Sequence, residues 1–168
     1  MSYIAHFQHA DEVVAHLNTV VPGLRDPLLK AKYTGFLAVS AVTTYELAVK
    51  TIFIDFAQVK HLAFGNFASR HFDKINGRIK IRNLKEDYIT KFGDKYLERF
   101  EKKIKRERAL YLAAHRRDAV SSYGNLIEAR NKFAHGGQVA ANSTYEETVR
   151  SYEDGKLVLK CLAESMRR

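Results

Sequence analysis

The sequence is poor in several residue types, and each scarcity excludes a class of protein. The single cysteine, Cys161, excludes an intrachain disulfide framework and a cysteine-rich zinc site, and its apolar neighbours predict a buried structural thiol. Only 2 prolines and 9 glycines exclude collagen-like and linker-rich architectures. No uninterrupted run of about 18 apolar residues occurs, so we expect no membrane span. The first residues lack a basic flank followed by an apolar run, so we expect no secretory signal and a cytoplasmic protein.

The charge of the chain is concentrated in one segment. The 168 residues have the composition of a single folded domain but carry a net charge of +9. Residues 70–117 hold 16 of the 28 basic residues and 7 of the 19 acidic ones, so the whole excess lies there. Such a segment suits a polyanion, and we predict RNA contacts from Lys102, Lys103, Lys105, Arg106 and Arg108. A solvated helix face with ion pairs between residues four apart is the alternative.

Hydrophobic periodicity predicts an all-α fold with one central helix. Asp26 and Pro27 form a helix start, and the pattern continues to about Lys60. Apolar residues recur there with a mean spacing of about 3.67, at Leu37, Ala41, Tyr45, Ala48, Ile52, Phe56 and Val59. A second apolar stripe leaves only a narrow polar sector, as expected for the central helix of a bundle.

Shorter helical patterns surround this helix. We expect them at residues 8–21, 62–76, 84–92, 94–112 and 118–134, with a loop at 78–83. A capping-box pattern from Ser143 to Glu146 opens a C-terminal helix, in which Gly155 is a candidate break. The predicted architecture is one elaborated helical bundle spanning residues 1–168.

Known catalytic and metal motifs are absent from the sequence. It contains no P-loop, no GxGxxG, no HExxH and no G-x-S-x-G. None of the 7 histidines stands in a recognised zinc spacing with an acidic residue, so we predict no metal and no cofactor.

One cluster of polar residues has the composition of a phosphodiesterase site. Arg130, Asn131 and His135 lie in the last turns of the helix predicted at 118–134, just before two glycines. An arginine offers a planar fork for a phosphate, and a histidine transfers protons near neutral pH. The alternative is a surface arginine and a histidine that helps to cap the helix. Five steps of 100° separate Arg130 from His135 by about 140°, so the arginine must reach round or the last turn must loosen.

Two earlier residues are candidates to support this cluster. Glu46 lies at the edge of the second apolar stripe and needs a partner. It either pairs with Lys50, four residues on, or contacts Arg130 or His135. Tyr123 lies seven residues before Arg130 and either lines a cleft or packs in the core.

The segment Arg130-Asn131-Lys-Phe-Ala-His135-Gly resembles the motif of the HEPN superfamily, in which an arginine and a polar residue precede a histidine. Four residues separate Arg130 from His135 here, and the Phe-Ala-His-Gly ending is also typical. Among its branches, the RiboL-PSP and MAE-type ribonucleases are the most similar. The resemblance implies a four-helix core with extra helices, residues 70–117 then forming a basic insert.

The resemblance also implies an activity. HEPN proteins of this kind are metal-independent endoribonucleases, often toxins of toxin–antitoxin pairs or effectors of phage defence. The ribose 2′-OH attacks the adjacent phosphate, and two protomers pair so that their motifs face one composite cleft. By this resemblance, His135 is the general base or acid, Arg130 stabilises the phosphate and Asn131 positions the pair. The alternative function is a non-catalytic helical module that binds nucleic acid or a protein partner, such as an adaptor or an antitoxin.

Overall fold

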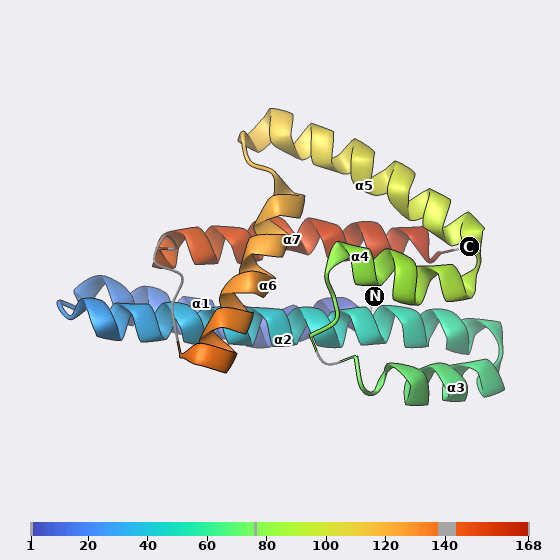
Figure 1. The fold of residues 1–168 in the computed structure, drawn as a ribbon, viewed down its shortest axis with the longest axis horizontal. Helices are drawn as coiled ribbons and strands as arrows, with labels where there is room; N and C mark the ends of the chain where they lie inside the picture. The colour runs from blue at the N-terminus through green and yellow to red at the C-terminus, as the bar shows by residue number, and fades with distance from the viewer. Residues whose placement is uncertain (1, 76, 138–143, 168) are drawn as a thin grey trace.

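The computed structural model describes residues 2–75, 77–137 and 144–167, and within these ranges it contains helices and no strand (Figure 1). The predicted all-α class is therefore confirmed. The main helices are α1 (Phe7–Val20), α2 (Pro27–Lys60), α3 (Leu62–Phe72), α5 (Asp94–His115), α6 (Ala119–Gly136) and α7 (Tyr145–Ser165). Short helical segments complete the described chain: η1 (Ser2–His6), η2 (Val21–Gly23), α4 (Ile81–Asn83), η3 (Leu84–Tyr88) and η4 (Ile89–Phe92).

The long helix α2 is the centre of the molecule. The Asp26 side chain accepts a hydrogen bond from the Leu28 amide at 2.8 Å, and Pro27 occupies the first helical position, as predicted. Helices α1, α3, α6 and α7 all pack on α2 (Figure 1). By length and composition α2 could cross a membrane, but 61% of its most apolar window is buried in the bundle. The apolar composition of α2 is therefore explained by its burial in the core of the bundle.

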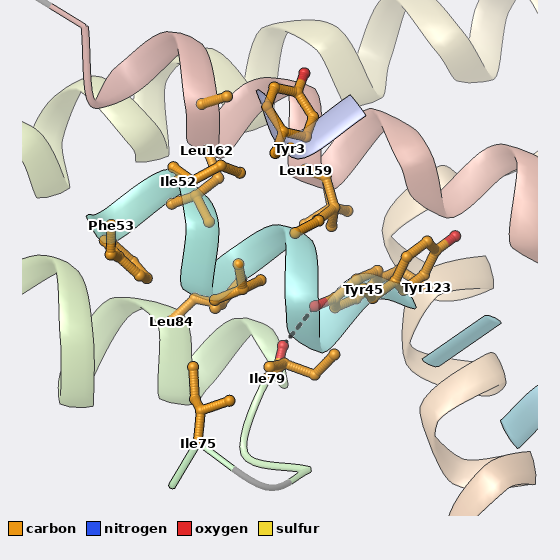
Figure 2. Packing of buried hydrophobic residues seen from close by; sticks show 14 of the residues in the cluster. Tyr3, Tyr45, Ile52, Phe53, Ile75, Ile79, Leu84, Tyr123, Leu159 and Leu162 are labelled. Carbon is orange, nitrogen blue, oxygen red and sulfur yellow. Dashed lines mark hydrogen bonds between the residues drawn. The ribbon is translucent and has the colours of Figure 1, made fainter. Parts of the chain in front are cut away.

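Helix α6 crosses α2 and α7 steeply (Figure 1). Three stacked tyrosines fill the crossing, and Figure 2 shows two of them, Tyr45 and Tyr123. The ring of Tyr45 lies 5.4 Å from that of Tyr123 and 5.8 Å from that of Tyr152. The Tyr45 hydroxyl donates to the Tyr152 carbonyl, and the Tyr123 hydroxyl donates to the Ile79 carbonyl at 2.6 Å. The first hydrogen bond joins α2 to α7, and the stacking of Tyr45 on Tyr123 places α6 against α2.

The expectation that Gly155 breaks the C-terminal helix is wrong. Helix α7 runs without interruption from Tyr145 to Ser165. A Cβ at Gly155 would lie 2.5 Å from the Tyr45 hydroxyl oxygen, so the glycine lets α7 approach α2 closely. The absence of a side chain at Gly155 therefore serves helix packing and not a turn of the chain.

The capping box lies one residue later than predicted. Thr144 is the N-cap of α7, its side chain accepts from the Glu147 amide at 3.1 Å, and the Glu147 carboxylate accepts from the Thr144 amide at 2.9 Å. Ser143 of the predicted box lies outside the described residues. The predicted helix at 62–76 ends at Phe72, and the predicted loop at 78–83 already becomes helical at Ile81.

Candidate functional site

The last turns of α6 extend past α2 (Figure 1). Contacts at both ends of the helix fix where these turns lie. The Asp118 side chain caps the start of α6 by accepting from the Val120 amide at 3.1 Å. Near the other end, the Phe133 ring sits directly against Gly35 of α2, where a Cβ would clash. Gly137 then ends the helix in the left-handed conformation, with φ of 60°. This segment is therefore anchored to α2 by close packing.

Arg130 points from α6 towards α2 and is mostly buried. One terminal nitrogen of its guanidinium donates to the Glu46 carboxylate, and the other donates to the Asn131 side-chain oxygen at 2.9 Å. Only 17% of the Arg130 side chain and 16% of the Glu46 side chain are exposed. A guanidinium has five N–H donors, so three remain available for an anion. These two contacts hold the Arg130 guanidinium in one orientation, so little side-chain entropy remains to be lost when an anion binds.

Gly77 forms a further wall of the arginine site, and the sequence analysis missed it. Its φ of 77° places it in the left-handed region, and a Cβ there would lie 2.9 Å from an Arg130 terminal nitrogen. A glycine between predicted helices signals a turn, but nothing in the sequence indicates which side chain that turn approaches.

His135 does not meet Arg130 within one chain. Helix α6 remains regular through Gly136, so the last turn does not loosen, and His135 is exposed. The described residues contain no hydrogen bond or ion pair between the two side chains. The angular separation of about 140° expected for a regular helix therefore persists.

Glu46 contacts Arg130 rather than Lys50. The Lys50 amine donates instead to the Asp73 carbonyl at 2.6 Å. Tyr123 is fully buried and stacked in the core, so the hypothesis that it lines a cleft is wrong. Burial raises the pKa of Tyr123 well above its usual value, and the nearby charge of Glu46 adds to the effect.

The predicted RNA-contacting run of α5 divides into two kinds of residue. Three of its five cations form ion pairs: Lys103 with Glu164 at 2.5 Å, Arg106 with Glu107 at 2.6 Å, and Arg108 with Asp118. Because Asp118 also caps α6, Arg108 has a structural role. Lys102 and Lys105 are exposed, and the described residues contain no ion pair of either. None of these three pairs joins residues four apart, but Arg82 and Glu86 in the same basic segment pair at that spacing, as the alternative expects.

A groove of about 510 Å³ lies between α6 and α7. Its charged lining is balanced, with three cations (Arg117, Lys132, Arg150) and three acids (Glu128, Glu147, Asp154). Asp154 is 1% exposed and accepts from Arg117, from Ser122 and, at 2.6 Å, from Tyr111. This network ties α7 to α5 and α6, and the sequence analysis missed it because its members are far apart in the chain.

Two further features bear on chemistry. Cys161 is buried as predicted, and burial raises the pKa of its thiol to about 11. Across residues 2–75, 77–137 and 144–167, no group of three or more His, Cys, Asp or Glu side chains is placed to hold a metal ion.

An all-helical bundle with Arg130, Asn131 and His135 at the end of α6 has the fold and the motif of the HEPN class. The family model RiboL-PSP-HEPN matches residues 7–167, and the chain belongs to this family. The resemblance inferred from the motif is thereby confirmed, and the family is associated with ribonucleases that act on RNA. Comparisons with curated proteins and with solved structures found no match.

Proposed function

We propose that the protein is a metal-independent endoribonuclease whose site is built from Arg130, Asn131 and His135. The observation that carries the proposal is the fixed guanidinium of Arg130, held by Glu46 and Asn131 at the end of α6 in a RiboL-PSP-HEPN chain. A cation fixed before the substrate arrives stabilises charge that develops in the transition state without reorganising.

The chemistry follows from the two side chains and the substrate. His135 takes the proton from the ribose 2′-OH, whose oxygen attacks the adjacent phosphorus. The bond from phosphorus to the 5′-oxygen then breaks, and the 5′-oxygen takes a proton from water. Arg130 stabilises the added negative charge on the phosphorane. The products are a 2′,3′-cyclic phosphate and a 5′-OH end, and the nucleophile belongs to the RNA itself.

A homodimer completes this site. Within one chain Arg130 faces Glu46 of α2, whereas His135 is exposed more than one turn later, about 140° further round the helix. A two-fold axis near the last turns of α6 brings His135 of one protomer towards Arg130 of the other. The proposed site is therefore shared between two copies of the chain.

The alternative is a non-catalytic helical module, and one observation favours it. Glu46 neutralises Arg130 in a largely buried ion pair, as it would in a purely structural role. In that case the protein binds RNA or a protein partner without cutting.

Product analysis separates the two functions. His135→Ala removes the proton-transfer group and is expected to slow RNA cleavage by roughly 10²-fold or more. Arg130→Ala is expected to cost about 3 kcal/mol of transition-state stabilisation. EDTA should leave the rate unchanged, and RNA with a 2′-deoxy substitution at the cut should resist. Products with 3′-OH and 5′-phosphate ends, or variants as active as the wild type, would contradict the proposal.

The cellular role we propose is that of a cytoplasmic toxin or phage-defence effector with a cognate antitoxin protein. Expression of a toxin of this kind arrests bacterial growth, and His135→Ala relieves the arrest. Normal growth despite high expression of active enzyme would contradict this role.

A further inference from the structure

A hollow of about 240 Å³ between α5 and α7 concentrates positive charge away from the Arg130 site. Arg99, Lys102 and Arg106 line it from α5, at spacings of three and four residues that place them on one helix face. Lys103 of α5 and Glu164 and Ser165 of α7 complete the lining. Four cations therefore face one carboxylate.

The contacts of these residues show which cations an anion can engage. Lys103 and Glu164 neutralise each other across the hollow, and each side chain is only 25% exposed. Arg99 donates to the Arg167 carbonyl at 3.1 Å, which is a neutral acceptor, and no carboxylate among the described residues forms an ion pair with it. Arg106 pairs with its chain neighbour Glu107, but its side chain is 66% exposed. Exposed pairs contribute little to stability, so a phosphate competes readily for Arg106.

The shape of the hollow limits what it binds. Small-molecule sites usually enclose roughly 300–1,000 Å³. This hollow of about 240 Å³ is smaller, and each of the residues that line it has a charged or polar side chain. It suits the phosphate of a longer polyanion whose remaining atoms stay outside. Because the chain belongs to a family that acts on RNA, the polyanion we consider is the RNA backbone.

The hollow is separate from the proposed cleavage site. Helix α5 packs on α7 at one edge of the molecule, and the last turns of α6 extend past α2 at the opposite edge (Figure 1). An RNA bound at both places has to pass around the bundle, so a short oligonucleotide reaches only one of them.

We propose that Arg99, Lys102 and Arg106 form a second RNA-binding site that holds backbone phosphates remote from the scissile bond. The inference rests on the proposed function for its ligand and adds Arg99, which the sequence analysis did not single out. It also selects Lys102 and Arg106 from the predicted basic run and leaves Arg108 to its structural pair with Asp118.

The test measures RNA binding in the His135→Ala background, so that cleavage does not interfere. The variant Arg99→Ala/Lys102→Ala/Arg106→Ala is compared with Arg25→Ala/Lys30→Ala/Arg70→Ala. The control removes the same three charges from exposed positions outside the hollow. Fluorescence anisotropy with a long structured RNA gives Kd at several salt concentrations. Each lost phosphate contact lowers the slope of log K against log salt by about 0.7, so the hollow variant should lose about 2 units of slope.

The outcomes are distinct. The site is supported if only the hollow variant loses slope in log K against log salt and also binds RNA at least roughly tenfold more weakly at low salt. Equal losses in both variants would mean that only the net charge matters. Unchanged RNA binding in the hollow variant would mean that these residues form a solvated face or bind a different partner. Either result overturns the site. In the active background, the hollow variant should raise KM for long RNA more than it raises KM for a short oligonucleotide. If the wild type cleaves no RNA, the proposed function fails while the binding comparison still decides the hollow.

Discussion

At the scale of single residues, Asp154 shows how one buried carboxylate links three helices. Burial, the largest single effect, pushes the pKa of Asp154 up, but hydrogen bonds from Arg117, Tyr111 and Ser122 outweigh it and hold the pKa below its usual value of 3.8. Because the folded-state pKa is lowered, the stabilisation is fully present above pH 3.8 and is lost as pH falls through the folded-state value.

Asp154→Asn removes the charge but keeps the side-chain size. We expect it to lower the free energy of unfolding by about 2 kcal/mol near neutral pH, since Arg117 loses its charged partner. The difference from the wild type should shrink below about pH 4 as the wild-type carboxylate becomes protonated. Denaturant unfolding from pH 7 to pH 3 measures it, and a difference independent of pH would rule out the linkage.

The Cys161 thiol is predicted to be chemically inert in the folded protein. With a pKa of about 11 and no exposed surface, almost none of it is thiolate at pH 8. A thiol reagent should therefore react only as fast as the protein unfolds, and rapidly in denaturant. Immediate labelling of the native protein would mean that the helices packed on α7 do not cover this residue.

Glu46 is predicted to be a positioning residue that acts through Arg130. Glu46→Gln keeps the shape but weakens the hold on the guanidinium, and we expect kcat to fall roughly 10- to 100-fold with little change in KM. Lys50→Ala is the control, because Lys50 lies one turn further along α2 and contacts the Asp73 carbonyl instead. A fall in thermal stability without a change in kcat would assign the pair to the fold alone.

At the scale of helices, two glycines with different surroundings form a matched pair. Gly155→Ala places a Cβ 2.5 Å from the Tyr45 hydroxyl oxygen, which is held by Tyr152, so we expect a loss of about 1–2 kcal/mol despite better helix propensity. Gly124→Ala on α6 meets nothing within 4 Å and should stabilise by roughly 0.5–1 kcal/mol. Chemical denaturation compares them, and equal effects would contradict the close approach of α7 to α2.

Helix periodicity predicts the elements well and their contacts poorly. The start and end of α2 follow from Asp26, Pro27 and a repeat near 3.6, which are local properties of the chain. The pairing of Glu46 with Arg130 depends on the angle at which α6 crosses α2, and no spacing along one helix encodes that angle. The π-helical segment at Leu84–Tyr88 was equally hidden, because one extra residue per turn leaves no compositional mark.

At the scale of the whole molecule, the separation of Arg130 from His135 makes the account depend on a second copy of the chain. Sedimentation at micromolar concentration is expected to give a dimer. An active monomer would mean that one chain contains the complete site, and the direction in which His135 points would then need another explanation.

The most direct test is the cleavage rate of a heterodimer with one Arg130→Ala chain and one His135→Ala chain, purified through two different tags. Each homodimer lacks one of the two groups everywhere and should cut RNA roughly 10²-fold or more slowly than the wild type. The heterodimer keeps one Arg130 and one His135 on different chains, so a shared site predicts that it cuts RNA and leaves 2′,3′-cyclic phosphate ends. A heterodimer as slow as the homodimers, or a homodimer as fast as the wild type, would contradict a site shared by Arg130 and His135 across two chains.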